Sequence, residues 1–314
     1  MGFNLVNLAI TVRTDDVSRL RLYLPLLGKE YAAACRCVLC HWPERVCETC
    51  TSQVTCGWSL VFGQKLTSDP AALKRHQKPP LPFVFSFPML EFFPDDHTEI
   101  VCGLVVIGQA IPFLEMLLNG FAKLLSGRSC QVTAEIIQIA CRDYQGAVQN
   151  SVIDASFIRT GNLIPENLII ASTDGLIESR IRDCSELQIR LLSPLRLLEA
   201  GHASCSFDVC LFVRSVMRRV SSLAYYYGDV EFDCDFKELS RQVENVICTD
   251  NHFSYINIKN SKLTGLIGHG SFLGDFSRFM PFLVVGSYVH TGKGSSFGMG
   301  SYEVYTGDVN FSSY

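Results

Sequence analysis

The order of strand-like and helix-like segments constrains the fold of this 314-residue chain more than any other feature. Alternating or β-branched apolar residues predict strands, and longer amphipathic stretches predict helices. In the first half these segments are, in order, a strand at 4–12, a helix at 17–27 interrupted by Pro25, a helix-prone stretch at 28–36, strands at 81–88 and 99–107, a helix at 110–125 and a strand at 130–141. Strand–helix–strand–strand–helix–strand is the order of a ferredoxin-like module.

The second half repeats this order without a close sequence repeat. Its segments are a strand at 187–197, a long amphipathic helix at 207–227, a helical insertion at 233–246, strands at 253–258 and 263–269, a helix at 276–288 and a strand at 302–305. We therefore predict an α+β protein of two tandem ferredoxin-like (RRM-like) modules. The expected boundaries are 1–142 and 185–314, with 143–184 as a connecting or inserted segment.

A glycine-rich segment precedes the last predicted strand. Four glycines (Gly292, Gly294, Gly298 and Gly300) and Lys293 lie within nine residues. Glycine permits positive φ and close backbone approach, so such a loop can direct several N–H groups and a lysine toward one anion. No Gly-Lys-Ser/Thr opens a helix here, so the segment is not a Walker loop. The alternative is a tight turn without a ligand.

Residues 288–304, Tyr-Val-His-Thr-Gly-Lys-Gly-Ser-Ser-Phe-Gly-Met-Gly-Ser-Tyr-Glu-Val, resemble the C-terminal signature of the CRISPR-associated endoribonuclease that processes precursor CRISPR RNA, a family of the RAMP superfamily. The resemblance continues through residues 187–197 and 207–227, and a weaker resemblance is present near the N-terminus. It implies metal-independent cleavage of CRISPR repeat RNA to mature crRNA, in which a 2′-hydroxyl attacks the adjacent phosphate and leaves a 2′,3′-cyclic phosphate and a 5′-hydroxyl. It also implies a protein that stays on its product within an interference complex.

Six of the fourteen cysteines fall between residues 35 and 56. Cys47-x-x-Cys50 has the spacing of a metal knuckle, and four thiolates close a tetrahedral zinc site or hold an iron–sulfur cluster. Guided by the resemblance, we expect structural zinc at Cys40, Cys47, Cys50 and Cys56, with Cys35 and Cys37 as alternates. The competing interpretation is a group of free thiols.

The resemblance places a catalytic histidine around the first helix or just after it, and this chain departs from that pattern. The helix offers Lys29 and Tyr31, and the nearest histidine is His41, whose alternatives are a metal ligand or a surface residue. His290, just before the glycines, is the second candidate for the general base, the role to which histidine is suited at neutral pH. Ser301 stands where many relatives have a basic residue.

An arginine stripe on the long helix is a further candidate for RNA contact. Arg214, Arg218 and Tyr225 recur on one helical face, where arginines contact phosphate and an aromatic ring stacks on a base. The alternative is that this helical face contacts only solvent. The predicted RNA-binding residues are Gly292, Lys293, Gly294, Ser295, Ser296, Gly298, Gly300, Arg214, Arg218 and Tyr225.

The net charge of −4 argues weakly against a nucleic-acid-binding protein, but its distribution is uneven. Residues 1–82 carry 10 Lys and Arg against 6 Asp and Glu, and phosphate binding needs a local basic face only. The start of the chain has no recognisable signal peptide, so we expect a cytoplasmic protein with no membrane partner. Two alternative functions are a non-catalytic RAMP subunit that holds guide RNA and a zinc-loop module that binds a protein.

Overall fold

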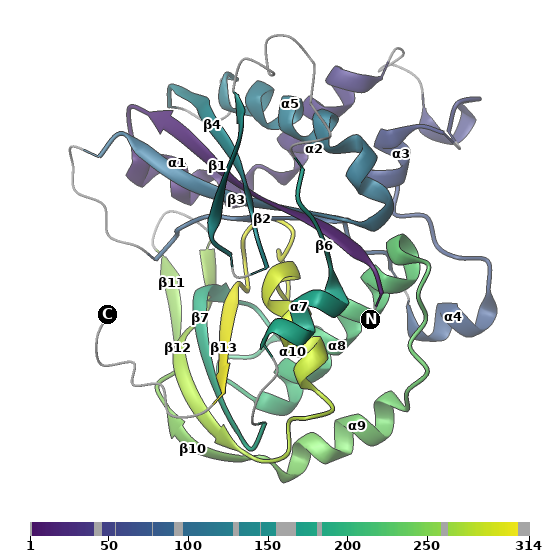
Figure 1. The fold of residues 1–314 in the computed structure, drawn as a ribbon, viewed down its shortest axis with the longest axis vertical. Helices are drawn as coiled ribbons and strands as arrows, with labels where there is room; N and C mark the ends of the chain where they lie inside the picture. Colours follow the sequence, from purple (N-terminus) through teal and green to yellow (C-terminus); the bar gives the residue numbers. More distant parts are fainter. Residues whose placement is uncertain are drawn as a thin grey trace.

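A computed structural model describes residues 2–40, 46–53, 55–76, 78–90, 97–127, 132–144, 146–154, 168–180, 184–258 and 263–306. Two antiparallel sheets with helices form two modules, one above the other in Figure 1. The predicted α+β class with two modules is confirmed. No helix within the described ranges is long and apolar enough to cross a membrane.

The first module has the strand order β2-β3-β1-β4-β5, of which β2-β3-β1-β4 is the ferredoxin-like core. Its elements are β1 (Asn4–Thr14), α1 (Val17–Tyr23), α2 (Gly28–Leu39), α3 (Gly57–Phe62), α4 (Pro70–Arg75), β2 (Phe83–Ser86), β3 (Glu99–Ile107), α5 (Leu114–Leu125) and β4 (Ala134–Arg142). The predicted 17–27 helix becomes two pieces, because Pro25 lies in a 3-10 turn between α1 and α2. The stretch before residue 82 contains α4, which Asp69 caps and Pro70 opens.

The segment at 143–184 contributes to the first sheet where the structure describes it. β5 (Val148–Asp154) pairs with β4, and β6 (Ile170–Ser172) pairs with the start of β1. α7 (Thr173–Arg180) follows β6 and contacts α10 of the second module. The segment thus extends the first sheet as well as connecting the modules.

The second module has the strand order β10-β12-β7-β13, again ferredoxin-like. Its elements are β7 (Glu186–Leu195), β8 (Leu198–Glu199), β9 (His202–Ala203), α8 (Val209–Gly228), α9 (Phe236–Gln242), β10 (Ile247–Asn251), β11 (Ser254–Ile258), β12 (Leu263–Leu273), α10 (Met280–Val289) and β13 (Tyr302–Thr306). The long helix α8 begins where the side chain of Asp208 accepts the N–H of Leu211.

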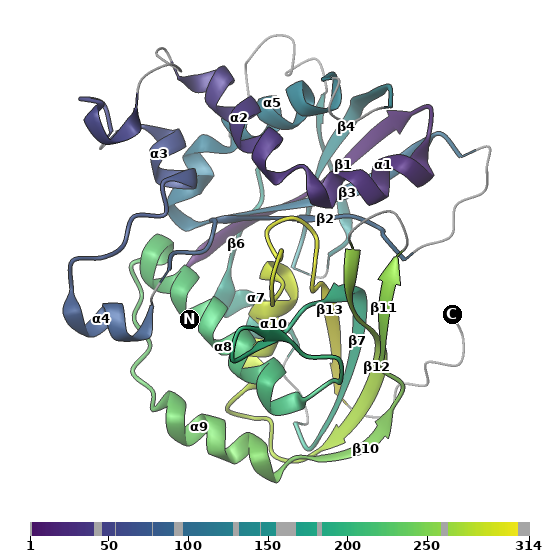
Figure 2. The ribbon, with the colours of Figure 1, turned by 180° about the vertical axis from the view of Figure 1, so that it is seen from behind.

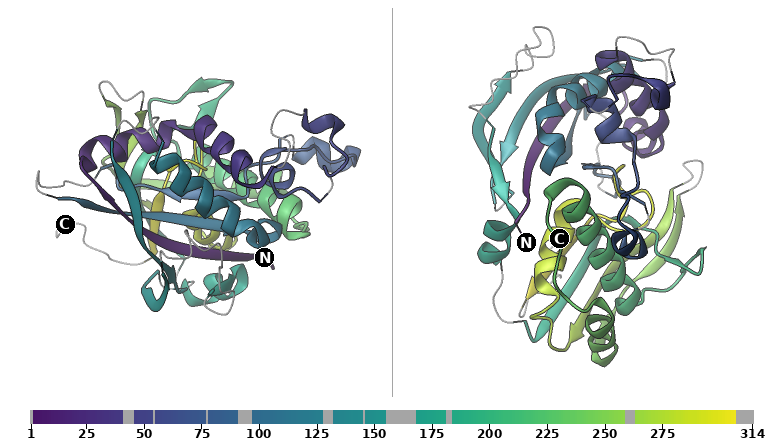
Figure 3. Two further views of the ribbon diagram at one scale, coloured as in Figure 1. Left: turned by 90° about the horizontal axis from the view of Figure 1, so that it is seen from above. Right: turned by 90° about the vertical axis from the view of Figure 1, so that its right-hand side faces the viewer.

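The two modules share apolar surface. Leu5, Val84 and Ile107 belong to strands of the first sheet but lie in the apolar core of the second module. Met299 of the second module lies in the core of the first. The right-hand view of Figure 3 shows the segment between α10 and β13, in yellow, at the boundary of the two modules. This boundary is where the glycine-rich segment lies.

Candidate functional site

The glycine-rich segment (residues 290–301, called the glycine loop below) has a backbone that only glycine adopts readily. Its four glycines all have positive φ: 79° at Gly292, 84° at Gly294, 88° at Gly298 and 66° at Gly300. At Gly300 a Cβ would lie 1.9 Å from the carbonyl oxygen of Thr291. The glycine pattern therefore has a conformational cause that acts before any ligand binds.

The glycine loop is a wedge between the modules. The ring of Phe297 lies 5.7 Å from that of Phe83 and 6.2 Å from that of Tyr31, and it packs against Gly28 at the start of α2. The N–H of Phe85 in β2 donates to the carbonyl of Ser296 at 3.0 Å. Figure 2 shows the yellow loop between the first module above and α8 below.

Burial divides the loop into a hidden part and an exposed tip. Ser295 is 5% exposed and Ser296 7% exposed, and Gly298 and Gly300 are buried as well. Their burial does not favour direct RNA contact by these four residues, which stays a prediction. Lys293 and Gly294 are exposed and Gly292 is half-buried, so the tip remains available.

Tyr31 is a core residue, and its burial does not favour the predicted catalytic role, which stays a prediction. Its side chain is 1% exposed, its hydroxyl donates to the carbonyl of Leu117 at 2.9 Å, and its ring lies 5.1 Å from that of Phe85. Burial raises the pKa of the Tyr31 hydroxyl well above its usual value. No substrate reaches this hydroxyl, because the ring is enclosed by the first module's core.

His290 does not have the properties of a general base at neutral pH. Its side chain is 4% exposed. Burial, and then the nearby Arg219 guanidinium, lower the pKa of His290 to about 3. The ring also hydrogen-bonds the backbone of Ser295, so it supports the loop from below.

Arg219 on α8 is a site residue that the sequence did not indicate. Its Nε donates to the carbonyl of Val289 at 2.7 Å, and its Nη2 donates to Ser296 Oγ at 3.3 Å. Burial lowers the pKa of Arg219 to about 10, which leaves it charged at neutral pH. The predicted stripe selected Arg218, which is exposed, one residue away. Arg219 therefore places a positive charge against the base of the glycine loop.

Arg196 lies beside the exposed tip of the loop. Its carbonyl accepts the N–H of Lys293 at 2.9 Å, and among the described residues its Nε has no hydrogen-bond partner. Lys29 is exposed in the first turn of α2, next to Gly28, which packs against Phe297. Lys293 thus lies at the tip, the backbone of Arg196 bonds to it, and Lys29 is the chain neighbour of a residue that contacts Phe297 of the same loop.

The stripe on α8 is only partly available. Arg214 forms an ion pair with Glu244 at 3.3 Å. Tyr225 stacks on His76 with ring centroids 4.8 Å apart, and its hydroxyl hydrogen-bonds Thr67. One face of the Tyr225 ring is therefore already covered. Arg218 is the member of the stripe that is exposed without such a contact in the described structure.

A second concave surface lies between the two sheets. A cavity of about 670 Å³ is lined by residues of both modules, including Arg142, Arg190, Tyr288, His290 and Glu303. The Nε of Arg142 has no hydrogen-bond partner within the described ranges, and burial lowers the pKa of this guanidinium. Two arginines in an interdomain cavity suit an anionic ligand.

The predicted metal cluster is not formed where the structure describes the cysteines. Cys40, Cys47, Cys50 and Cys56 are partly exposed, and within the described residues they make no group of three or more ligands close enough to share an ion. His41 lies outside the described residues. Structural zinc at these cysteines and catalysis by His41 both stay predictions.

Comparison with known proteins gives a family match for the C-terminal part of the chain and a structural match for nearly all of it. Residues 189–302 match the model for CRISPR-associated endoribonuclease Cas6, and residues 31–160 match a model described as an N-terminal domain. Thermus thermophilus Cas6 (TTHB231) superposes with a TM-score of 0.53 at 12% identity, over 96% of this chain and 99% of that one. Residues 189–302 thus match the Cas6 family model, and the chain as a whole has the fold of these Cas6 structures.

Two further structures have the same fold. The Cas6 (TTHB231) product complex aligns with a TM-score of 0.55 at 13% identity, over 96% of this chain and 99% of that one. A partial Cas6-RT-Cas1–Cas2 complex aligns with a TM-score of 0.53 at 12% identity, over 96% of this chain but 46% of that one. No curated protein matches the sequence. The match at 189–302 contains most of β7, all of α8 and the glycine loop, so the resemblance inferred from these residues is confirmed.

Proposed function

We propose that this protein is an endoribonuclease that cleaves CRISPR repeat RNA, with the RNA backbone lying over the exposed tip of the glycine loop. The observation that carries the proposal is the match of the endoribonuclease family to the residues that build this loop. Cas6 structures with this fold include the product complex of TTHB231 and a substrate-mimic complex of TTHA0078. Lys293, Lys29 and Arg196 supply the charge that phosphate binding requires.

The proposed reaction is attack of a 2′-hydroxyl on the adjacent phosphate without a metal ion. The 2′-hydroxyl loses its proton to a base, and its oxygen forms a bond to phosphorus. The bond between phosphorus and the 5′ oxygen breaks, and the 5′ oxygen takes up a proton. Cations near the phosphate stabilise the charge that develops in the transition state. Lys293 and Lys29 are suited to this role, and the protonated Arg219 supports it from beneath the loop.

Lys29 lies in the first turn of α2, at the opposite end of the helix from Leu39. The helix rises about 1.5 Å per residue, so Leu39 lies about 15 Å from Lys29 along its axis. The Lys29 end contacts Phe297 of the glycine loop through Gly28. We therefore propose that Lys29 acts at the phosphate held by Lys293.

A second candidate function is a RAMP subunit that binds guide RNA without cutting it. One observation favours it: α2 has no histidine, and His290 is buried. Both candidates bind repeat RNA through the same tip. We also propose that the protein stays on its product within a CRISPR complex; one structure of this fold is part of a Cas6-RT-Cas1–Cas2 complex.

Purified protein incubated with end-labelled repeat RNA in EDTA separates the candidates. We expect cleavage to a 2′,3′-cyclic phosphate and a 5′-hydroxyl, and no cleavage of RNA carrying a single 2′-deoxy nucleotide at the cut. Lys293→Ala should weaken RNA binding and should reduce the slope of log Kd against the logarithm of the salt concentration by about one. Lys237→Ala, at an exposed position on α9, should change neither the affinity nor the slope. Binding without cleavage would favour the non-catalytic subunit, and no binding would refute both.

A further inference from the structure

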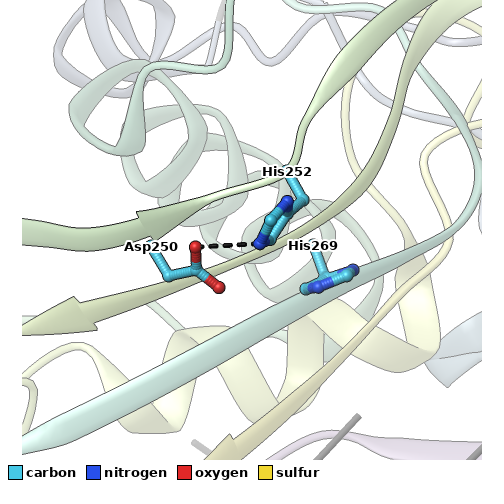
Figure 4. Close-up of side chains that lie close together, drawn as sticks. All are labelled: Asp250, His252 and His269. Carbon is cyan, nitrogen blue, oxygen red and sulfur yellow. Dashed lines mark ion pairs between the residues drawn. The ribbon is translucent and has the colours of Figure 1, made fainter. Parts of the chain in front are cut away.

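Three side chains with metal-binding atoms meet on the surface of the second module, away from the glycine loop. The ligand atoms of Asp250, His252 and His269 all lie within 4.8 Å of one another (Figure 4). Nε2 of His252 lies 2.9 Å from Oδ1 of Asp250, and the two imidazole rings are 4.9 Å apart. Within the described ranges no other group of three His, Cys, Asp or Glu residues meets this criterion.

The backbone that carries these residues is tightly fixed. His252 N–H donates to the carbonyl of His269 at 2.9 Å, across the pairing of β10 with β12. Gly268 has a φ of 110°, and a Cβ there would lie 2.1 Å from the carbonyl oxygen of His252. Phe253, the next residue, stacks on Phe207 with centroids 3.9 Å apart. The three ligands are therefore placed by strand pairing and packing, without an ion.

We propose that Asp250, His252 and His269 bind a divalent transition-metal ion, with Zn²⁺ as the expected occupant. Two imidazole nitrogens and one carboxylate oxygen are a zinc donor set, and water completes the tetrahedron. Mg²⁺ and Ca²⁺ prefer oxygen ligands alone and are not expected.

The geometry allows the ion to bind after a small adjustment. With metal–ligand distances of about 2.0–2.1 Å, ligand atoms of a tetrahedral site are about 3.4 Å apart. Side-chain rotation is the movement that would close the site from 4.8 Å. The side chains of His252 and Asp250 are 59% and 47% exposed, which leaves them room to rotate toward the half-buried His269.

The ion would join β10 to β12. All five residues of β10 are exposed, and β10 stands at one end of the strand order of its sheet, next to β12. A ligand that binds the folded state alone stabilises it, so zinc should raise the melting temperature. Because the site is separate from the glycine loop, the inference does not depend on the proposed ribonuclease function.

Zinc titration of the full-length protein tests this inference. The protein is prepared without a polyhistidine tag, stripped with EDTA, exchanged into buffer containing a thiol-free reductant, and titrated with ZnCl₂ by calorimetry and thermal shift. His252→Ala and His269→Ala should each weaken binding by more than the roughly 10–100-fold cost of losing a second-shell partner. Asp250→Asn should weaken binding and still fold. His202→Ala removes an exposed histidine elsewhere and should change nothing.

Cobalt distinguishes this site from the cysteines. Co²⁺ bound by two histidines and an aspartate gives visible d–d bands, whereas thiolate ligation adds a near-ultraviolet charge-transfer band. We expect His252→Ala/His269→Ala to remove one ion whose spectrum lacks that band, and a crystal grown with zinc to show an anomalous peak between the three side chains. Equal stoichiometry and affinity for the wild-type and double variant proteins would overturn the proposal, as would a peak located elsewhere.

Discussion

At the scale of single residues, exposure rather than residue type separates the site from its surroundings. Arg218 and Arg219 are adjacent and chemically identical, yet Arg219 bonds the base of the glycine loop and Arg218 faces solvent. Tyr31 and His290 have suitable chemistry but are buried. A helical stripe read from the sequence cannot identify which flank of α8 the loop covers, because that depends on contacts between distant residues.

His290 makes stability depend on pH in a predictable direction. The pKa of His290 is about 3 in the folded protein, against about 6.5 for an unperturbed histidine. Between these values the unfolded chain binds a proton that the folded chain does not, so stability falls as pH falls. The contribution reaches up to about 1.4 kcal/mol per pH unit. Between about pH 7 and pH 4, the free energy of unfolding measured in urea should therefore fall more steeply for wild type than for His290→Asn.

Asparagine is the suitable replacement, because His290 has a φ of 55° and asparagine tolerates positive φ. The comparison concerns the slopes, since His290→Asn also changes stability at neutral pH. His202→Asn, at an exposed position, should keep the wild-type slope. Identical slopes for wild type and His290→Asn would contradict the buried, neutral state of this histidine.

At the scale of elements, the local sequence pattern predicts most helices and strands, but it does not predict how the glycine loop packs. The apolar run before the loop and the β-favouring residues after it correctly predicted α10 and β13. The glycines suggested close approach to a phosphate, whereas the structure assigns them to positive φ and packing against Thr291 and Phe87. His252 and His269 were not recognised as a pair, because only the register of β10 and β12 brings them together.

Gly300→Ala measures the packing contribution of the glycine loop. Positive φ costs a non-glycine residue about 1–2 kcal/mol, and overpacking typically adds about 1–3 kcal/mol. Gly201 is a matched control, since its φ is 87° and nothing lies within 4 Å of the position that a Cβ would take there. We expect Gly300→Ala to lose more free energy of unfolding in urea than Gly201→Ala, and to weaken RNA binding. Equal losses would mean that the loop is not tightly packed.

At the scale of the whole molecule, the glycine loop couples the modules. Phe297 comes from the second module, but its ring packs with Tyr31, Phe83 and Phe85 of the first. Apolar residues of the first sheet lie in turn within the second core. The sequence predicted two modules, but it contains no local signal for an interface formed by residues roughly two hundred positions or more apart.

Phe297→Ala should weaken this coupling. Phenylalanine-to-alanine changes in cores cost about 3–5 kcal/mol of the free energy of unfolding. Because Phe297 is only partly buried, we expect a loss of about 3 kcal/mol. Because the lost contacts cross the boundary, we expect calorimetry to show one unfolding transition for wild type and two for Phe297→Ala. Phe297→Leu keeps apolar contact and should retain one transition with a smaller loss. A single transition for Phe297→Ala at an unchanged temperature would mean that other contacts join the modules and that the loop's position does not depend on this ring.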